Sequence, residues 1–600
     1  MSSQYSAPLS DMRFALFDVL KMDQQAQALG FEEANRDLID AVLDEAARFA
    51  ETVLAPLNAV GDREGCRFDP ATGAVTTPPG FRDAYAQYVE NGWASLTAPA
   101  EYGGQNLPHA LGAPIKEMID AANLAWGNFP LLSHGATEAL LQHGTDWQRE
   151  TFLKPLVDGR WTGTMCLTEP HCGTDLGLLK TRAVPQDDGT YRITGTKIFI
   201  TAGEHDFTDN IVHLVLARLP DAPAGSRGIS MFIVPKRLVN DDGSSGEANG
   251  VRCGAIEHKM GIHGSATCVL NLDDAKGWLI GEPHKGLHAM FTMMNSARVA
   301  VGLQGLALAD RAWQNALRYS RERLQMRALT GPKYPDKPAD PIIVHPDVRR
   351  MLLTQKALVE GGRLLGYHAT GLVDTVLHGQ TPDQRRQADE LLGFLTPIVK
   401  ACLTEWGVEC TYHAQQCFGG HGYIVEHGME QLARDARITT LYEGTTGVQA
   451  LDLVGRKLLQ LQGAGLRVFG GMLEAFFREQ AGNADLAEFL QPLQAAAAQS
   501  QQLALHIGTQ AAQNPDEAGA ASWDFLFHCG YVVLAYWWAR AVAAADAAPH
   551  LSQAFKDAKR ATARFYFSRI LPRTHTHAAA IQAGSASLMA LDADHFDAAS

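Results

Sequence analysis

The chain has 600 residues, of which 46% are hydrophobic and 20% are charged, and its formal net charge is −15. Its length excludes a single hydrophobic core, so we expect roughly three or four domains. The negative charge disfavours a general nucleic-acid binder, which needs a basic face, and no uninterrupted apolar run is long enough to span a bilayer.

Cysteine use and the N-terminal residues indicate the compartment. The nine cysteines are scattered along the chain and include no Cys-x-x-Cys pair. The first residues lack the pattern of a secretory signal peptide. Reduced thiols fit this distribution best, so we expect a cytoplasmic protein.

The N-terminal part of the chain has the apolar spacing of helices. Residues 11–22 mix charged and apolar side chains in the manner of an amphipathic helix. Helical periodicity follows over residues 31–60 and 80–160. Within the second range we expect loops at Ala98–Gly104 and at Gly127–Phe129, where glycines interrupt the pattern.

From about residue 163 the pattern changes to short strands. The turn signal Asp188-Gly189 precedes residues 191–201, which are rich in β-branched and aromatic side chains. Further strands are predicted at 211–216, 228–235, 269–272 and 278–280, with a flexible loop at 238–250. This section therefore predicts a small β-domain of about a hundred residues.

Long helices return after the β-domain. They run from Gly286 to about residue 460, with a proline-rich insertion at 331–341. After Gly463 an alanine- and glutamine-rich region keeps helical spacing, which predicts a further helical bundle. The predicted domains are an N-terminal extension at 1–35, a helical domain at 36–161, the β-domain at 162–285, a helical bundle domain at 286–460 and a C-terminal helical extension at 465–600.

The segment Tyr442-Glu443-Gly444-Thr445-Thr446 is the most informative part of the chain. Glycine directly after a carboxylate lets the backbone approach a bound ligand closely, and two threonine hydroxyls follow. A base that removes a proton from carbon needs such a carboxylate, placed on a turn beside backbone N–H groups. Taken alone, the segment also fits a surface turn with an exposed Glu.

Four blocks of sequence resemble the signature blocks of the acyl-CoA dehydrogenase family. They are Met165–Asp175 (Met-Cys-Leu-Thr-Glu-Pro-His-Cys-Gly-Thr-Asp), Lys197–Thr201, Gln416–Tyr423 and Tyr442–Thr445. One block alone is weak, but four in the family's order and at its spacing are specific. The resemblance covers roughly residues 40–460.

The resemblance implies a fold as well as a subgroup. The implied fold is mainly α with a central β-domain: a helical N-domain, a small β-barrel-like middle domain, a four-helix-bundle C-domain and an extra C-terminal helical domain. Residues 5–14 and the long C-terminal region resemble a large-chain bacterial subgroup. That subgroup includes 3-methylmercaptopropionyl-CoA dehydrogenases and broad fatty acyl-CoA dehydrogenases.

The resemblance implies FAD as the cofactor. Met165, Leu167 and Thr168 are expected to line the flavin, whose pyrimidine edge needs hydrogen-bond donors. Phe199 and Thr201 match positions against the flavin ring, although a strand with one face in the core gives the same alternation. The other residues implied to hold FAD are Thr174, Arg323, Gln325, Gln416, Phe418, Gly419, Gly420, Thr445 and Thr446.

Part of the implied FAD site comes from a second subunit, so we expect a homodimer. The segments around Arg323 and Gly419-Gly420 match blocks that reach FAD across a subunit interface, and arginine suits a bidentate contact to pyrophosphate. A solvated basic helix face is the alternative for the arginine segment. Gly447 stands where the family usually has Gln.

The implied substrate site comprises Thr174, Asn295, Arg298, Tyr442 and Gly444. Arg298 matches a family arginine near the thioester, while Asn295 replaces the more usual Asp and removes a charge partner. Thr174 keeps the hydroxyl of the family's Ser. No metal is expected, because His575 and His577 have no cluster of carboxylates or cysteines around them.

The expected activity is α,β-dehydrogenation of an acyl-CoA, with Glu443 taking the α-proton and electrons passing to electron-transfer flavoprotein. The substrate is a fatty acyl-CoA or 3-methylmercaptopropionyl-CoA. An acyl-CoA oxidase is the first rival. A DNA-binding flavoprotein of the alkylation response is the second, disfavoured because acids outnumber bases over residues 465–600. A catalytically silent adaptor is disfavoured by the presence of Glu443.

Overall fold

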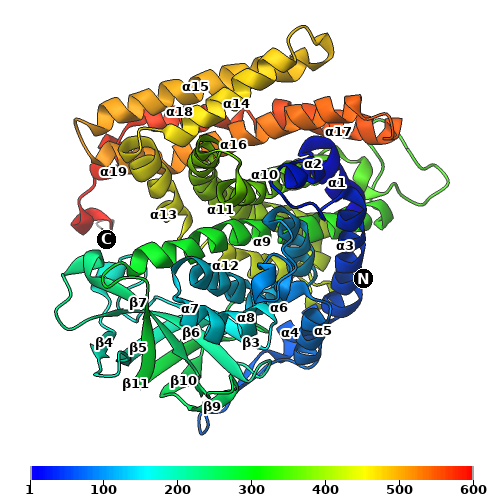
Figure 1. Cartoon of the computed structure of the whole chain (residues 1–600). Coiled ribbons are helices and arrows are strands. Elements are labelled where there is room, and N and C mark those ends of the chain that lie inside the picture. The colour runs from blue at the N-terminus through cyan, green and yellow to red at the C-terminus, as the bar shows by residue number, and fades with distance from the viewer. Residues whose placement is uncertain (1–2, 598–600) are drawn as a thin grey trace. The chain divides into compact units, whose positions relative to one another are not determined.

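The structure, a computed structural model, describes residues 3–597 and confirms a mainly helical chain with a central sheet (Figure 1). The chain divides into two units. The helical unit takes the residues up to Asp44, Pro108–Glu117 and everything from Val301 onward. The sheet unit takes Glu45–Leu107 and Met118–Ala300. The division into five predicted domains stays a prediction.

Helices of the N-terminal half belong wholly or partly to the sheet unit. They are α3 (Arg36–Phe49), α4 (Ala55–Glu64), α5 (Phe81–Glu90), α6 (His109–His143), α7 (Asp146–Gln148) and α8 (Lys154–Val157), and α3 and α6 begin in the helical unit. The predicted loop at Ala98–Gly104 contains only a 3₁₀ turn at Ala100–Tyr102.

The predicted loop at Gly127–Phe129 is wrong, because the interruption of α6 lies earlier, at Asn123. This residue has φ −160° and ψ 91°. Its side-chain Oδ1 accepts a hydrogen bond from Trp126 N at 3.1 Å. Asn123 thereby caps the second half of α6, which is the role that asparagine commonly plays where a helix begins.

The central sheet closes into a barrel. Its strands are β3 (Trp161–Cys166), β4 (Arg182–Pro185), β5 (Tyr191–Thr201), β6 (Asn210–Arg218), β7 (Ile229–Pro235), β10 (Val251–Ile256) and β11 (Thr267–Ile280). They pair in the order β10-β11-β5-β4-β6-β3, and β7 pairs with both β11 and β6. Because β7 joins β11 to β6, the ring β11-β5-β4-β6-β7 has no free edge, which confirms the β-barrel-like middle domain.

Two strand predictions change in the structure. The predicted strands at 269–272 and 278–280 are parts of the single strand β11. The predicted loop at 238–250 contains a hairpin of β8 (Arg237–Val239) and β9 (Ser245–Ala248). Gly243, with φ +79°, makes its turn, and Asp242 Oδ1 accepts from Ser244 N at 2.9 Å. Turn residues that looked like a flexible linker therefore close a hairpin.

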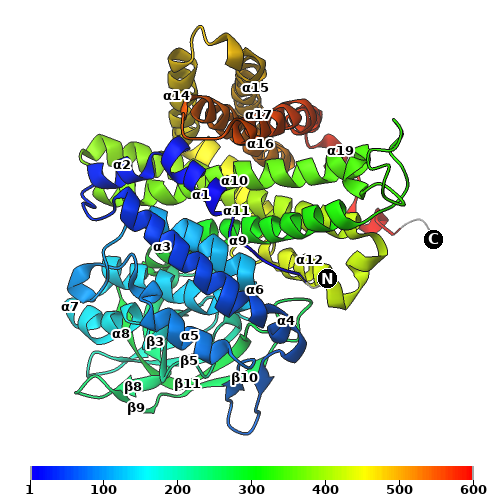
Figure 2. The ribbon, with the colours of Figure 1, turned by 90° about the vertical axis from the view of Figure 1, so that its right-hand side faces the viewer.

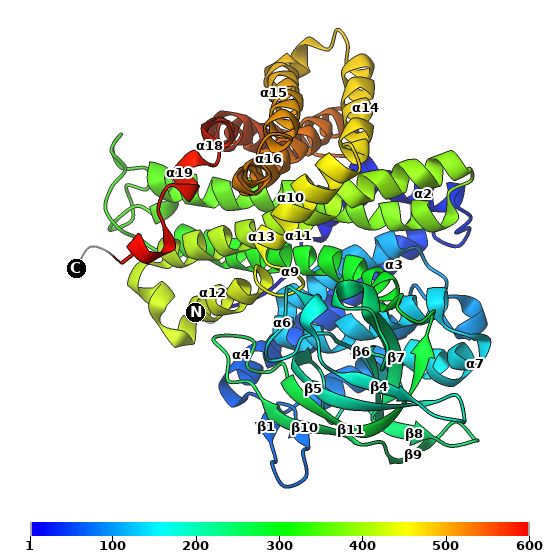
Figure 3. The ribbon, with the colours of Figure 1, turned by 90° about the vertical axis from the view of Figure 1, so that its left-hand side faces the viewer.

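The helical unit is built around three long helices. They are α9 (Gly286–Glu322), α10 (Pro346–His378) and α11 (Pro382–Phe418), and Figure 3 shows α10 and α11 side by side. Among the described residues, one segment, Pro382–Tyr423, contains a window apolar enough to cross a membrane, with mean hydropathy 1.3. That window is 78% buried inside the protein, as expected for a core helix.

The C-terminal region is helical, as predicted. It comprises α14 (Ala464–Glu479), α15 (Ala487–Ala511), α16 (Asp516–Ala547), α17 (Gln553–Phe565), α18 (Arg573–Ala583) and α19 (Ala586–Met589) (Figure 2). Most residues of α16 from Phe525 to Val542 are buried, so this helix is the core of the region. Trp538 Nε1 donates to Ala357 O of α10 at 3.0 Å, which attaches α16 to the long helices.

The first residues form an N-terminal strap, which we define as residues 3–13, along the helical unit. Gln4 N donates to Asn315 Oδ1 of α9 at 2.9 Å, and Asn315 Nδ2 returns a bond to Gln4 O at 2.8 Å. The strap ends in α1 (Leu9–Arg13). Its neighbour Phe14 lies edge-on to Phe555 of α17, with ring centroids 5.2 Å apart.

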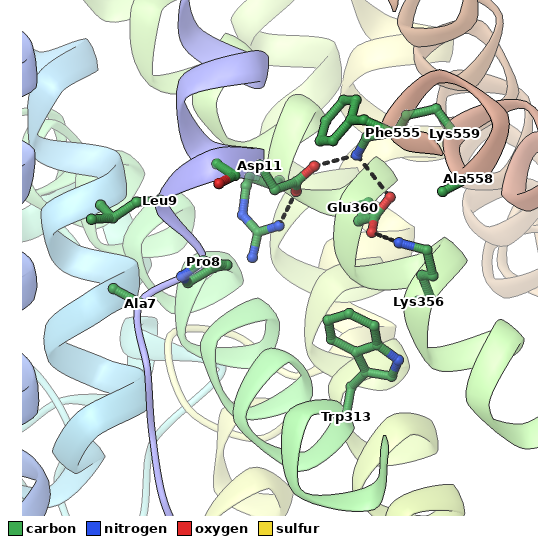
Figure 4. A pocket seen from close by; sticks show the side chains of 12 residues that line it. Ala7, Pro8, Leu9, Asp11, Trp313, Lys356, Glu360, Phe555, Ala558 and Lys559 are labelled. Atoms are coloured by element: carbon green, nitrogen blue, oxygen red, sulfur yellow. Dashed lines mark hydrogen bonds and ion pairs between the residues drawn. The ribbon is translucent and has the colours of Figure 1, made fainter. Parts of the chain in front are cut away.

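Buried charges join the strap to α10 and α17 (Figure 4). Asp11 accepts hydrogen bonds from Arg363 and Lys559. Lys559 Nζ also donates to Glu360 at 2.8 Å. We define the charged cluster as Asp11, Glu117, Asp310, Glu360, Arg363 and Lys559; part of it lines a cavity of about 300 Å³. A strap that is weakly apolar is thus held by ion pairs.

An ion pair between α11 and α18 predicts a pH-dependent stability. Arg573 donates from both terminal nitrogens to Glu409, at 2.9 and 2.6 Å. Burial raises the pKa of Glu409, but bonds from His413 and Arg573 outweigh it and lower the pKa to about 2. The carboxylate therefore stabilises the fold above its ordinary pKa, and this contribution is lost as the pH falls from about 4.5 to about 2.

We expect Glu409→Gln to destabilise the protein by about 2 kcal/mol at pH 7 and by progressively less as the pH falls toward 2. The thermal midpoint of unfolding, measured from pH 7 to pH 2, checks this. Glu488→Gln is the control, since its partner Arg564 leaves it 40% exposed and such pairs contribute under about 1 kcal/mol. Equal midpoints for Glu409→Gln and the unchanged protein at pH 7 would contradict the prediction.

Candidate active site

Glu443 lies on a strained turn of the helical unit. The turn follows α12 (Met429–Thr439) and precedes α13 (Thr446–Leu451). Glu443 has φ +57° and Gly444 has φ +94°, so two successive residues are left-handed. A non-glycine residue in this region costs about 1–3 kcal/mol and is commonest at functional sites. The half-buried Glu443 carboxyl group is thus held in an unusual backbone conformation.

Both threonines after Glu443 hold the ends of this turn. Thr445 caps α13, its Oγ1 accepting from Val448 N at 3.4 Å. Thr446 Oγ1 donates to Glu405 Oε1 of α11 at 2.6 Å, and Thr446 N donates to Thr440 O at 3.2 Å. The bond to Glu405 ties the turn to α11 and the other two bonds close the turn, so both threonines hold the backbone around Glu443.

In the sheet unit, Phe199 stands out on β5. Its φ is +59°, and 58% of its surface is exposed. The pairing of β5 with β11 shifts register between Cys268 and Leu270, which leaves an extra residue on β5 next to Phe199. A bulge of this kind re-aims a side chain, so a large aromatic ring faces outward from a strand whose neighbours Lys197 and Ile200 are buried.

The end of β3 is joined to this bulge. Ile198 N donates to Thr168 O at 2.9 Å, and Lys197 Nζ donates to Leu167 O at 2.9 Å. The structure therefore brings Leu167 and Thr168 to the same edge of the barrel as Phe199, with Met165 buried just before them on β3. Thr201, half-buried, ends β5.

A buried ion pair supports that edge and was not assigned a role from the sequence. Lys197 Nζ lies 2.9 Å from Glu169 Oε1, and both side chains are almost fully buried. Burial raises the pKa of Glu169, but Lys197 and bonds from Thr181 and Lys180 N hold that pKa below its ordinary value. Glu169, His171 and Cys172 also bring metal-ligand atoms within 4.8 Å of one another, but the Glu169 carboxylate is already bound by Lys197.

These features fit a flavin. An isoalloxazine ring needs a flat apolar partner and nearby polar groups, and this edge has an outward-facing Phe199 with the hydroxyls of Thr168 and Thr201. A core strand, the alternative considered for Phe199, would bury the ring. Thr174 lies exposed in the loop that follows β3.

The two segments expected at a second subunit's FAD meet at Tyr319 of α9. Arg323 N donates to Tyr319 O at 2.8 Å. The Tyr319 ring stacks on Phe418, with centroids 4.1 Å apart, and its hydroxyl lies 2.8 Å from His421 Nδ1. Phe418 is therefore buried and supports the exposed Gly419-Gly420 turn, a link that no sequence motif indicated.

The remaining predicted residues lie in both units. Arg323, Gln325 and Gln416 are exposed in the helical unit. Asn295 is exposed and Arg298 is buried on the part of α9 that belongs to the sheet unit. Tyr442 lies beside Glu443, and its hydroxyl donates to Gln304 of α9. Gln304 and Gln449, which also contacts the turn, were not predicted because neither belongs to a recognised block.

Family models of the acyl-CoA dehydrogenases match nearly the whole chain. The model of the N-terminal domain matches residues 37–160, that of the middle domain residues 164–275 and that of the C-terminal domain residues 284–459. A further model, described as acetyl-CoA dehydrogenase C-terminal like, matches residues 469–592.

Known relatives match over similar lengths. A 3-methylmercaptopropionyl-CoA dehydrogenase of Ruegeria pomeroyi is 44% identical, covering 94% of this chain and 96% of the relative. The broad-specificity linear acyl-CoA dehydrogenase FadE5 of Mycobacterium tuberculosis is 35% identical, covering 98% of this chain and 99% of the relative.

A solved structure shares the fold. The crystal structure of an acyl-CoA dehydrogenase complexed with FAD, from Bacillus anthracis, has a TM-score of 0.74 and 21% identity, covering 92% of this chain and 89% of that one. The family models and the relatives that match over nearly the full length show the family, and the solved structure agrees in fold. The chain therefore belongs to the acyl-CoA dehydrogenase family, whose members are FAD-dependent oxidoreductases.

Proposed function

We propose that the chain converts an acyl-CoA thioester to its trans-2-enoyl-CoA, with Glu443 as the base. The observation that carries this proposal is the half-buried Glu443 on a left-handed turn, in a chain whose barrel presents an outward-facing Phe199. Met165, Leu167, Thr168, Phe199 and Thr201 would hold the flavin.

Glu443 removes the α-proton of the substrate. Its carboxylate accepts the proton, and the electrons of that C–H bond become the second bond between the α- and β-carbons. Bound FAD supplies the two-electron acceptor for the hydrogen that leaves the β-carbon. Tyr442 and Gly444, on either side of the base, are proposed to hold the thioester, and Arg298 is proposed to hold the CoA part.

The proposed substrate is a fatty acyl-CoA or 3-methylmercaptopropionyl-CoA, and the proposed electron acceptor is an electron-transfer flavoprotein. The names of the relatives from Ruegeria and Mycobacterium support both kinds of acyl chain. A homodimer is proposed because Tyr412, Tyr423, Ile424 and Val425 expose large apolar surfaces beside the Gly419-Gly420 turn. A cytoplasmic location is proposed because all nine cysteines are free thiols.

The test is a panel of acyl-CoA thioesters from 3-methylthiopropionyl to palmitoyl, scored by anaerobic bleaching of the flavin. Bleaching by at least one thioester, followed by faster reoxidation with electron-transfer flavoprotein than with air, is the expected result. Faster reoxidation by air would identify an oxidase instead. A purified protein that cannot bind flavin would refute the proposal.

Arg323→Ala is expected to weaken FAD binding by roughly 10- to 100-fold, because a charged hydrogen bond contributes about 1.5–3 kcal/mol. The ratio of flavin to protein absorbance after gel filtration measures this. Arg321→Ala is the matched control, since Arg321 is an exposed arginine on the last turn of α9. If both variants keep the same flavin content, Arg323 does not contact FAD.

A further inference from the structure

One buried side chain contacts the backbone of both strained residues in the proposed catalytic turn. Gln449 of α13 is fully buried. Its Nε2 donates to Glu443 O at 3.2 Å and reaches Gly444 O at 3.5 Å. The bond crosses from α13 back to the turn, so it closes the loop that carries Glu443. A carbonyl group held in this way fixes the peptide plane beside it.

The oxygen of the Gln449 side-chain amide makes no hydrogen bond among residues 3–597. This atom, Oε1, is buried. A buried, unpaired acceptor is costly, so a side chain that only filled space here would be better apolar. The donor end therefore accounts for a polar residue at this position.

Gly444 packs directly against the Gln449 amide. A Cβ atom added to Gly444 would lie 2.5 Å from Gln449 Nε2. With φ +94°, Gly444 also has a conformation that other residues rarely adopt. This close approach leaves no room for a side chain at position 444, which explains why glycine follows the base.

A second hydrogen bond holds the residue that precedes Glu443 in the sequence. The Tyr442 hydroxyl donates to Oε1 of Gln304, which is fully buried on α9. Glu443 is thus flanked by a residue tied to α9 through its side chain and a residue tied to α13 through its backbone. With both neighbours held, the orientation of the Glu443 carboxylate depends on these two glutamines.

We propose that Gln449 is a positioning residue for the base: its amide holds the left-handed turn at Glu443-Gly444 and so aims the carboxylate at the α-proton. This inference rests on the proposed function of Glu443. In the proposed mechanism Gln449 contacts neither the substrate nor the cofactor. Its loss therefore lowers the rate of proton removal and leaves the binding of acyl-CoA and FAD in place.

The test compares Gln449→Met, which keeps the length of the side chain without a donor, with Gln449→Glu, which keeps its shape. We expect kcat to fall about 10- to 100-fold in both, with KM changed less than about 3-fold and flavin content unchanged. The kinetic isotope effect of an α-deuterated substrate should rise, because α-proton removal becomes slower, while a β-deuterated substrate shows a smaller change.

Gln355→Met is the matched control. Gln355 is also a fully buried glutamine of the helical unit, and its Nε2 donates to Met351 O of α10 at 3.1 Å. The control should lose stability without a change in kcat or in the isotope effects. Gln449→Asn, which keeps an amide of smaller volume, provides the comparison if the other two variants do not fold.

The outcomes separate this inference from the function on which it rests. Unchanged kcat and isotope effects in the Gln449 variants, with Glu443→Gln inactive, would overturn the positioning role and leave the base in place. Equal losses in Gln449→Met and Gln355→Met would also overturn it. Full activity of Glu443→Gln would instead overturn the proposed base, whatever the Gln449 variants do.

Discussion

Glu443→Gln should lower the rate of substrate-dependent flavin bleaching by about 10²- to 10⁴-fold, the usual contribution of a general base. The amide is nearly isosteric with the carboxyl group but cannot accept the α-proton. The left-handed turn and its bonds from Gln449 involve the backbone, so the fold and the bound FAD should be retained. Anaerobic stopped-flow absorbance with saturating acyl-CoA measures the rate.

Two further variants define the result. Glu443→Asp keeps a carboxylate but withdraws it by one methylene, so we expect an intermediate rate. Glu426→Gln changes an exposed glutamate of the same unit and should leave bleaching unaltered. An undiminished rate in Glu443→Gln, with normal flavin content, would mean that another residue is the base.

Arg363→Met should destabilise the helical unit by about 3–5 kcal/mol, because it leaves buried carboxylates without their counter-charge. Arg363 is 1% exposed, and its Nη2 lies 2.6 Å from Glu117 Oε1 and 3.2 Å from Asp310 Oδ1. Its Nη1 donates to Asp11 of the N-terminal strap. One guanidinium group therefore neutralises carboxylates from three separate parts of the chain.

The loss should grow with pH. Burial raises the pKa of Asp310 to about 7, with Glu117 adding to the effect and Arg363 opposing it. A raised pKa favours the folded state while the group is protonated, and that advantage is lost as the pH rises through the folded value. Without Arg363 the opposing charge is gone, so the deficit should be larger at pH 8 than at pH 5.5.

The thermal midpoint of unfolding at both pH values measures this effect. Arg386→Met is the control, because Arg386 makes ion pairs with Asp383 and Glu390 at the surface and is 56% exposed. Its removal should cost under about 1 kcal/mol. Equal shifts in midpoint for the two variants would show that the charged cluster contributes no more than a surface pair.

Local sequence patterns predicted the elements that depend on local burial. The β-branched run at 191–201 is strand β5 with the same ends, and the alanine- and glutamine-rich region after Gly463 is helical. The family blocks also indicated Glu443 and Phe199 as site residues. The strand and helix patterns repeat over a few residues, and a period of two or of 3.6 residues indicates directly which face of the element is buried.

Tertiary structure decided the features that depend on distant partners. Asn123 interrupts α6 because its side chain caps the following turn, whereas the nearby glycine at 127 is simply helical. Tyr442 meets Gln304 across 138 positions of sequence, and Arg363 meets Asp11 across 352. Hydrogen bonds and ion pairs of this range have no period, so sequence by itself determined the family and indicated Glu443 as the proposed base, while packing decided which residues contact the turn that carries it.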